Sequence, residues 1–474
     1  MACSKSHHNA LFSLIPINKK AEAVVNDPQN HHLTSQWPDG TRGLDIGFHI
    51  CSKSPTTLAT LGRGDCDVII SDSEISRLQC SFEIHKDTHV VMLYDRSYYH
   101  TTQVFGNDAT PFELGRDRKV VIHKHLNTKI GMGGKTQTLI MFDLLWYFDV
   151  MAAIEKVQQR QQITFLDYKE NPRLARTAEA TASPGQTSDP PKIRYSALGL
   201  IGRGCSGTAV LRVIHVDSGN LMAVKRLRPP QGATDKELDD WKISLNREAK
   251  SLGKLDHPHI VVYIGCQGLD TPDPEIIMGL MDGSLDALVS IGEGLDVDRL
   301  CCQMLLALRW LNCHNFIHRD VKPENILYKT FSDGHEFQLS DFKVCTPIGS
   351  AWSFAGTIPY MAPEVWTPSE KPLTSKVDVW SLYVTMLWTL EESFRTDCPK
   401  LKHATDVQQV VALSRSMEGL KKFQRMAVVD PDERAEAIDI LQTVFHSDVM
   451  NYSSCNFSLK TIEEDAEALS TANG

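Results

Sequence analysis

A glycine-rich segment near the middle of the chain has the spacing of a phosphate-binding turn. It reads Gly202-Arg-Gly-Cys-Ser-Gly207 and lies between apolar runs that look like two strands of a hairpin. Glycines let backbone amides approach phosphate oxygens without a side chain in the way. Ordinary tight glycine turns share this spacing, so the motif alone indicates nucleotide binding only weakly.

Five further elements follow in a fixed order and add charged groups to this turn. Ala223-Val-Lys225 lies in an apparent strand and Glu248 in an apparent helix. A buried lysine beside phosphates needs such a carboxylate to hold its position and its charge. After them come His318-Arg-Asp-Val-Lys-Pro-Glu-Asn325, Asp341-Phe342 and Ala362-Pro-Glu364. Five elements in this order and spacing are not a chance arrangement.

With these motifs the sequence closely resembles the eukaryotic protein kinases, over about Tyr195 to His446. The resemblance implies phosphoryl transfer from ATP with Mg²⁺, in which positioning and charge neutralisation do most of the catalytic work. Lys322, and Gly356-Thr357 ahead of the Ala-Pro-Glu segment, resemble the serine/threonine branch. A non-specific serine/threonine protein kinase is therefore the expected class.

The resemblance also implies a role for each matching residue. Asp320 would orient the substrate hydroxyl and accept its proton, Asn325 and Asp341 would hold magnesium, and Lys225 would contact phosphates while paired with Glu248. The catalytic set is Asp320, Lys322 and Asn325. The expected ATP-binding residues are Ile201, Gly202, Arg203, Gly204, Cys205, Ser206, Gly207, Ala209, Ala223, Lys225, Glu248, Met278 and Met281.

Other matches are expected to support the site rather than to act in it. Glu364 and Arg434 resemble the family's buried ion pair, and Asp378 resembles its structural aspartate. Met278 stands at the gatekeeper position, and Gly279-Leu-Met281 would be the hinge that bonds the adenine.

Three positions depart from the family pattern. The family's Asp-Phe-Gly triplet ends here in Lys343, which lacks the backbone freedom of glycine. Ala209 replaces the valine that packs on adenine, and Tyr383 stands where the family usually has glycine. Because all charged catalytic positions are present, an active kinase is the main hypothesis. The alternative is a catalytically silent, phosphopeptide-binding scaffold, a pseudokinase.

Hydroxyl side chains in the expected activation segment, residues 341–364, predict control by phosphorylation. The candidates are Thr346, Ser350, Ser353 and Thr357. Arg319 resembles the arginine that pairs with an activation-loop phosphate in regulated kinases. For Thr357 a contact with Asp320 is the competing expectation.

The region from about Gly43 to Trp146 has short apolar runs separated by clusters of Gly, Asp, Ser and Thr. This spacing favours a β-sandwich whose recognition surface lies on the loops at one end. Arg63, Ser76 and Arg77 fall on neighbouring loops there. The combination suits a phosphate, because arginine offers a bidentate fork and serine a neutral donor.

As a set, these residues resemble the forkhead-associated (FHA) domain, which binds phosphothreonine peptides. The motifs are Leu61-Gly-Arg63, Ser76-Arg77-Leu-Gln79 and Asp95-Arg-Ser97. Gln79 stands where the family usually has histidine, and Tyr99 and His100 replace an Asn-Gly that contacts the peptide backbone. Retained phosphate contact with altered peptide preference is the expectation. A degenerate FHA domain, kept as a structural or dimerising unit, is a third hypothesis.

The predicted fold is therefore multi-domain, an all-β FHA sandwich followed by a two-lobed α+β protein kinase fold with a β-rich N-lobe and an α-helical C-lobe. A chain of 474 residues exceeds what one core supports. The predicted segments are an N-terminal extension (1–37), the FHA domain (38–150), a helix and flexible linker (151–194), the kinase domain (195–447) and an acidic tail (448–474).

Composition limits the partners and the compartment. A net charge of -10 opposes binding to nucleic acid, and the most apolar stretch, residues 139–154, is too short and too charged to span a membrane. Twelve cysteines without metal-ligand spacing indicate reduced thiols, so an intracellular protein of the nucleus, the cytoplasm or both is expected.

The domain order resembles the FHA-containing checkpoint effector kinases and related fungal FHA-kinases. Expected partners are protein substrates with Ser or Thr acceptors and phosphothreonine-containing proteins. A phosphate-dependent homodimer is a further expectation, because capture of a second copy raises its local concentration.

Overall fold

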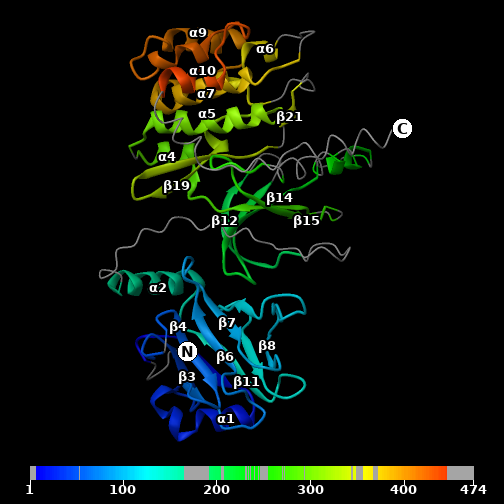
Figure 1. The fold of residues 1–474 in the computed structure, drawn as a ribbon, viewed down its shortest axis with the longest axis vertical. Coiled ribbons are helices and arrows are strands. Elements are labelled where there is room, and N and C mark those ends of the chain that lie inside the picture. The colour runs from blue at the N-terminus through cyan, green and yellow to red at the C-terminus, as the bar shows by residue number, and fades with distance from the viewer. Residues whose placement is uncertain are drawn as a thin grey trace. The chain divides into compact units, whose positions relative to one another are not determined.

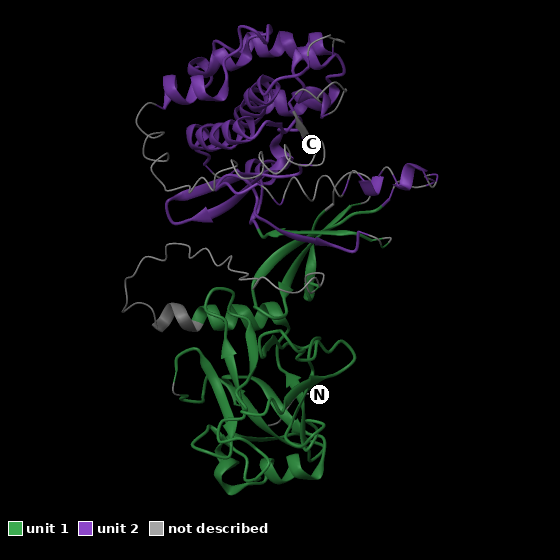
Figure 2. Cartoon of the chain, turned by 45° about the vertical axis from the view of Figure 1, so that its right-hand side comes forward, with its two compact units in different colours: residues 1–228, 271–280 green, residues 229–270, 281–474 purple. Residues whose placement is uncertain are grey.

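The computed structural model describes residues 7–445 except 53, 165–191, 204–207, 230–231, 233, 235, 240, 244, 246–252, 254, 270, 272, 293, 343–344, 349–355 and 367–371. The chain divides into two compact units. Unit 1 comprises residues 1–228 and 271–280, and unit 2 comprises residues 229–270 and 281–474 (Figure 2).

The N-terminal part of unit 1 is a β-sandwich, blue to cyan in Figure 1. Its first sheet has the strand order β2-β3-β1-β11-β10-β8 and its second the order β5-β4-β6-β7-β9. The first sheet contains β1 (Ala10–Pro16), β2 (Thr34–Gln36), β3 (Arg42–Gly47), β8 (Thr102–Phe105), β10 (Lys129–Met132) and β11 (Ile140–Trp146). The second contains β4 (Thr57–Gly62), β5 (Val68–Ile69), β6 (Cys80–Ile84), β7 (Val91–Asp95) and β9 (Lys119–Val121). All-β architecture is what the sequence predicts for this region.

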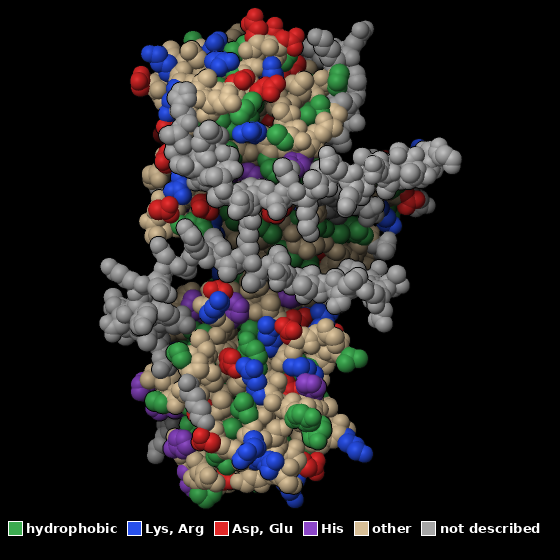
Figure 3. All heavy atoms as spheres, viewed as in Figure 1, with side chains coloured by type: hydrophobic (Ala, Val, Ile, Leu, Met, Phe, Trp, Pro, Cys, Tyr) green, Lys and Arg blue, Asp and Glu red, His purple; other side chains and the backbone are tan. Residues whose placement is uncertain are grey.

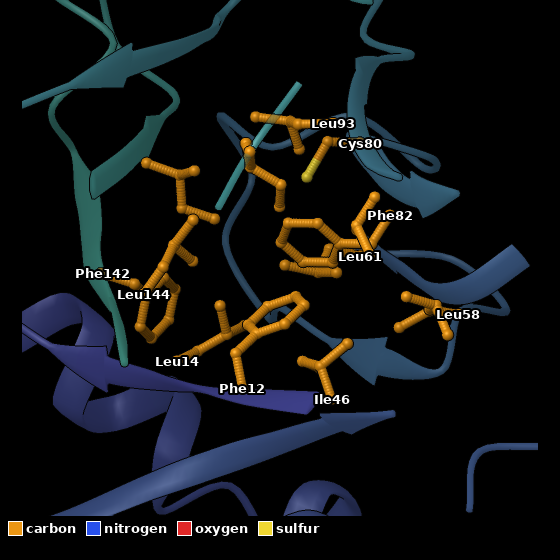
Figure 4. Packing of buried hydrophobic residues seen from close by; sticks show 14 of the residues in the cluster. Phe12, Leu14, Ile46, Leu58, Leu61, Cys80, Phe82, Leu93, Phe142 and Leu144 are labelled. Carbon is orange, nitrogen blue, oxygen red and sulfur yellow. The ribbon is translucent and has the colours of Figure 1, made fainter. Parts of the chain in front are cut away.

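Alternate residues of the strands fill the space between these two sheets. Phe12 and Leu14 of β1 point toward Phe82 of β6 and Leu61 of β4 (Figure 4). The rings of Phe12 and Phe82 meet edge to face, with centroids 5.1 Å apart. Side chains in a strand alternate between faces, so each strand supplies every second residue to this core.

Strand β1 lies in a segment that the sequence boundaries assign to an N-terminal extension. It pairs with both β3 and β11. Its buried Ser13 donates a hydrogen bond to the carboxylate of Asp45 in β3, which also accepts from the Tyr147 hydroxyl at 2.8 Å. The sandwich therefore begins near residue 10, because buried polar groups as well as apolar packing hold β1 in the sheet.

Short helices flank the sandwich. They are α1 (Lys19–Val25), the 3-10 helix η1 (Pro28–Leu33) and α2 (Val150–Thr164). Helix α2 covers the segment predicted to be helical, and Ala153, Ile154 and Val157 form its buried face at helical spacing.

A third sheet, with antiparallel strands, completes unit 1. Its strands there are β12 (Tyr195–Arg203), β13 (Ala209–His215), β14 (Leu221–Arg226) and β16 (Glu275–Gly279), in that order. Val213, Met222, Val224 and Ile277 form a buried cluster on one face of this sheet. The opposite face carries Ala223 and Lys225, because neighbouring residues of a strand point to opposite sides.

Unit 2 is mainly helical. Its strands are β15 (Tyr263–Gln267), β17 (Gly283–Ser284), β18 (Phe316–Ile317), β19 (Ile326–Phe331), β20 (Gly334–Leu339) and β21 (Thr346–Pro347). Its α-helices include α4 (Leu285–Ser290), α5 (Val297–Cys313), α6 (Pro363–Trp366), α7 (Lys376–Leu390), α8 (Glu392–Asp397), α9 (Ala404–Ser414) and α10 (Ala437–Val444). Its 3-10 helices include η4 (Pro323–Asn325), η5 (Ile358–Tyr360), η6 (Cys398–Lys400) and η7 (Lys421–Ala427).

Helix α5 lies at the centre of unit 2, beside α7 and α10 (Figure 1). Leu300, Met304, Ala307, Leu308 and Leu311 of α5 are buried, as their helical spacing predicts. Among the described residues, no helix combines the length and apolarity that a membrane crossing requires. On the face shown in Figure 3, basic and acidic side chains are interspersed where described residues are visible.

Candidate active site and phosphopeptide site

The loop between β18 and β19 carries Asp320 in a fixed backbone conformation. Arg319 has φ of 70°, which a non-glycine residue adopts only when its surroundings hold it there. The carboxylate of Asp378 accepts hydrogen bonds from the amides of His318 at 2.8 Å and Arg319 at 2.7 Å. Burial raises the pKa of Asp378, while these two amide bonds oppose the rise. Asp378 is thus the structural aspartate that the sequence predicts.

The Asp320 carboxylate is the centre of a buried polar cluster. Its Oδ1 accepts a hydrogen bond from the Thr357 hydroxyl at 2.7 Å. Its Oδ2 lies 3.0 Å from the Lys322 ammonium and accepts from Nδ2 of Asn325 at 2.9 Å. Lys322 also donates to Thr357 at 2.7 Å. The three predicted catalytic residues are therefore in direct contact with one another.

The electrostatics of this cluster favour an ionised Asp320. Burial alone would raise the pKa of Asp320, but the Thr357 hydrogen bond and the Lys322 ammonium together hold that pKa below its usual value. A carboxylate in this state is a hydrogen-bond acceptor at neutral pH, and so it can orient a hydroxyl group.

Gly356 places Thr357 against Asp320. Its φ is 119°, and a Cβ at this position would lie 2.5 Å from the carbonyl oxygen of Arg319. Only glycine allows this close approach of the two backbone segments. The hydroxyl of Thr357 is consequently engaged with Asp320 and Lys322, which is the competing expectation for this phosphorylation candidate.

The candidate magnesium ligands lie on adjoining segments. The amide and hydroxyl of Ser340 donate to the carbonyl of Asn325 at 2.8 and 2.9 Å, and Asp341 is the next residue, with φ of 63°. His318 contacts the Ser340 carbonyl at 3.0 Å, and its ring packs edge to face on Phe342, with centroids 4.8 Å apart. An amide oxygen and a carboxylate held this way fit the oxygen donors that Mg²⁺ prefers.

The phosphate-binding half of the predicted site belongs to unit 1. Strands β12 and β13 form the expected hairpin around the glycine segment, with Gly202 opposite Val210. Lys225 of β14 lies opposite both Val210 and Ile276, and Ala223 lies opposite Met278. Directly opposed residues share a sheet face, so these positions form one surface.

The strand register differs at one position from what the motif spacing predicts. Ala209 lies opposite Arg226, so it falls on the face away from Ala223 and Lys225. Val210 takes the place on the Lys225 face that the sequence predicts for Ala209. Ile201 lies in β12 of this hairpin and is 49% exposed.

Several predicted residues lie outside the part of the chain that the structure describes. They are Gly204, Cys205, Ser206, Gly207, Glu248, Lys343, Ser350 and Ser353. The backbones of Arg203 and Thr346 are described, in β12 and β21. Met281 belongs to unit 2 and is partly buried.

Two supporting features of unit 2 follow the family pattern or compensate for a departure from it. Arg434 binds Glu364 in a bidentate pair, with distances of 2.6 and 2.9 Å. Tyr383, where the family usually has glycine, is fully buried, and its hydroxyl lies 3.1 Å from that of Ser414 in α9. The tyrosine therefore has a polar partner in the core.

The predicted phosphate-contacting residues of the sandwich lie on two loops that are hydrogen-bonded to each other. The amide of Arg63 donates to the carbonyl of Ser76 at 3.1 Å, and that of Gly64 donates to Arg77 at 2.9 Å. The side chains of Arg63 and Arg77 are exposed and that of Ser76 is partly exposed. The structure thus brings the three predicted residues together with their side chains accessible.

Gln79 positions the Ser76 loop, a role that its replacement of the family's histidine does not reveal. It is fully buried, and its Oε1 accepts from the amide of Ser76 at 2.9 Å. Its Nε2 donates to the hydroxyls of Thr101 at 3.0 Å and Thr102 at 2.9 Å. Glutamine both donates and accepts, so it joins the Ser76 loop to the segment after residue 100.

The loop that replaces the family's Asn-Gly is also ordered by hydrogen bonds. Ser97 accepts from the amide of Thr101 at 2.8 Å, and His100 has φ of 54°. Tyr98 and Tyr99 are 83% and 78% exposed, and their rings meet edge to face at 4.9 Å. Two exposed aromatic side chains therefore project from a constrained backbone, in the segment that leads to Thr101, a partner of Gln79.

Two family descriptions match the chain. The protein kinase domain matches residues 195–461, and the FHA domain matches residues 59–122. The second match contains Arg63, Ser76, Arg77 and Gln79, and the first contains the whole Asp320 cluster.

Curated relatives match the kinase region. MAP kinase kinase kinase mkh1 of Schizosaccharomyces pombe is 29% identical over 52% of this chain and 24% of its own length. Serine/threonine-protein kinase ste20 of Aspergillus oryzae is 30% identical over 56% of this chain and 31% of its own. Mitogen-activated protein kinase kinase kinase 2 of Arabidopsis thaliana is 32% identical over 42% of this chain and 31% of its own length.

The match to this chain covers 16% to 42% of the lengths of such relatives. The kinase-domain match, by contrast, extends over more than half of this chain. The chain belongs to the protein kinase family and carries an FHA domain ahead of its kinase domain.

Proposed function

We propose that this chain transfers the γ-phosphoryl group of ATP to serine or threonine hydroxyls of protein substrates. The observation that supports this most is the contact of the Asp320 carboxylate with Thr357, Lys322 and Asn325. Bound ATP and Mg²⁺ would supply the phosphoryl group and neutralise its charge.

The chain's own residues supply orientation and charge in this proposal. Asp320 accepts a hydrogen bond from the substrate hydroxyl and then takes its proton. Lys322 stabilises negative charge beside the acceptor oxygen. Asn325 and Asp341 would hold Mg²⁺ through side-chain oxygens, and Lys225 of β14 would contact the phosphates.

Magnesium-dependent transfer of labelled phosphate by the purified chain tests this activity. Lys225→Met and Asp320→Asn serve as controls, and both should abolish transfer. A rate that is unchanged in Asp320→Asn would contradict the assignment. No transfer by wild type, together with transfer by Lys343→Gly, would instead favour the silent scaffold.

We propose that Arg63, Ser76 and Arg77 bind the phosphate of phosphothreonine peptides, with Tyr98 and Tyr99 altering the peptide preference. Binding of the full chain to a phosphothreonine peptide pool tests this, with the unphosphorylated pool as control. Arg63→Ala should remove the preference for phosphate. Equal binding of both pools by wild type would favour the degenerate FHA domain.

We further propose that phosphate capture by the FHA domain recruits substrates or a second copy of the chain. Sedimentation before and after phosphatase treatment tests the dimer, which should dissociate on dephosphorylation. The pathway stays a prediction. The domain order resembles checkpoint effector kinases, whereas two of the relatives above are named as MAP kinase kinase kinases.

Phosphorylation of the activation segment is proposed to act through Arg319. Burial lowers the pKa of the Arg319 guanidinium, although Asp378 and Cys345 oppose the shift. A phosphate on Thr346, Ser350 or Ser353 would supply a strong counter-charge. Alanine variants of these three residues should lose the activation that prior incubation with ATP produces.

A further inference from the structure

The FHA sandwich and the kinase N-terminal strands meet along a sheet edge within unit 1. Strand β9 is the outer strand of the sheet β5-β4-β6-β7-β9, and an outer strand has unpaired backbone groups on one side. The amide of Val121 in β9 donates to the carbonyl of Val216 at 2.8 Å. Val216 lies in the turn between β13 and β14, so this turn covers part of the sandwich edge.

Apolar packing continues across this junction. Ile214 and Val216 are fully buried and belong to the same hydrophobic cluster as the sandwich core. Gly219 in the turn has φ of 79°, and a Cβ there would lie 2.8 Å from the sulfur of Met92 and 3.2 Å from Val90. Such a close fit is typical of a packed interior rather than of two surfaces that touch occasionally.

Polar contacts fix the same turn from the FHA side. Arg116 donates to the carboxylate of Asp217 at 2.8 Å and to the carbonyl of Lys192 at 2.8 Å. Arg194 also binds Asp217 and donates to the carbonyl of Pro111 at 2.7 Å. The side chains of Arg116, Asp217 and Arg194 are only 14%, 11% and 13% exposed. Such a partly buried, multiply bonded set is stronger than an exposed ion pair.

The loop that supplies Arg116 also reaches the candidate phosphopeptide site. Arg118 donates to the carbonyls of His100 at 3.1 Å and Thr102 at 3.0 Å, and it binds the buried carboxylate of Asp95. Residues 113–119, which we call the coupling loop, therefore contact the kinase turn at one point and the Tyr98–His100 loop at another.

We propose that the FHA domain has a second role in this chain, as an intramolecular docking domain for the kinase N-terminal lobe. Strand β9 and the coupling loop hold the β13–β14 turn, and β14 carries Lys225 four residues after the docked Leu221. Docking therefore fixes one end of the strand that presents the phosphate-contacting lysine. This role requires neither phosphopeptide binding nor catalysis.

Amide hydrogen exchange on the full chain tests the proposal, with Val121 as the reporter. Asp217→Arg from the kinase side and Arg116→Glu from the FHA side each place like charges together. Each should raise Val121 exchange roughly tenfold, and the double variant should recover part of the protection, because the 116–217 pair re-forms with reversed charges while Arg194 still faces the new arginine. Asp333→Arg is the matched control, since Asp333 pairs with Arg299 at 3.3 Å but is 72% exposed.

Three outcomes would overturn the docking role. Equal Val121 exchange in wild type and both single variants would mean that the turn is not docked in solution. Exchange that rises in the single variants without recovery in the double variant would indicate general unfolding. Protection that depends on protein concentration would assign the contact to a second copy. The measurement uses no ATP and no peptide, so its failure is separate from failure of the proposed activity.

Discussion

The hydroxyl of Thr357 donates to Asp320 and accepts from Lys322, with both distances at 2.7 Å. It therefore links the Asp320 carboxylate to the Lys322 ammonium. Thr357 directly precedes η5 (Ile358–Tyr360), so its hydroxyl joins this part of the activation segment to the loop that carries Asp320.

Replacing Thr357 by valine should change the pH dependence of transfer as well as its rate. The Thr357 hydrogen bond lowers the pKa of Asp320, so its loss raises that pKa. Activity needs the ionised carboxylate, and the acid limb of kcat/KM should therefore move to higher pH, with kcat falling about tenfold to a hundredfold. Thr357→Ser is the control and should keep the wild-type limb. An unmoved limb in Thr357→Val would show that the hydroxyl does not tune Asp320.

Gly356→Ala should destabilise unit 2 and reduce activity together. The new methyl group would meet the Arg319 carbonyl at 2.5 Å on a backbone with φ of 119°. Strain of this kind costs about 1 to 3 kcal/mol. Thermal unfolding measures the loss. Gly294→Ala is the control, because nothing lies within 4 Å of the position of its added Cβ. Equal melting temperatures for the two variants would contradict the proposed close approach.

The motifs correctly predict several contacts of the kinase region, because the motif residues contact residues near them in the chain or residues of another motif. The Asp378 contacts and the Glu364–Arg434 pair are examples. The position of Val210 on the Lys225 face was not predictable from these motifs. The motif spacing counts residues from the glycines, whereas the face is set by pairing with the neighbouring strand.

Contacts between residues far apart in the chain also explain why the sequence did not predict β1 and the role of Gln79 in the sandwich. Strand β1 is recognisable only through β3 and β11, which lie far along the chain. Gln79 looks like a loss of the family histidine until its three partners are seen. The docked turn likewise joins residues more than 90 positions apart, Val121 and Val216.

Gln79 gives a direct test of how the phosphopeptide loops are held. Gln79→Leu keeps the volume but leaves the Ser76 amide and two threonine hydroxyls without their partner. We expect the chain to lose about 1 to 3 kcal/mol of stability and to bind phosphothreonine peptides roughly tenfold more weakly. Gln79→His restores the family residue and should retain most of the affinity, as measured by fluorescence anisotropy. Full affinity in Gln79→Leu would show that these loops need no such link.

The burial of His123 predicts that the folded protein loses stability in mild acid. It is 4% exposed, and its Nε2 lies 3.0 Å from the Ser196 hydroxyl of β12. Burial lowers the pKa of His123 to about 4, and the nearby His125 adds to the shift. Between about pH 6.5 and 4 the unfolded chain binds a proton at this residue that the folded chain does not. Its contribution to stability is therefore complete above pH 6.5 and is lost as the pH falls.

The expected loss from His123 is roughly 2 kcal/mol at pH 5 relative to pH 7.5. Urea unfolding of wild type and His123→Gln at both pH values measures it, because glutamine cannot take up the proton. The difference in unfolding free energy between the two pH values should be smaller by about that amount in the variant. His125→Gln, which removes a neighbouring histidine instead of the buried one, should keep most of the wild-type pH dependence. An identical pH dependence in wild type and His123→Gln would mean that His123 is accessible to protons in the folded chain, and hence that the contact with Ser196 is not maintained.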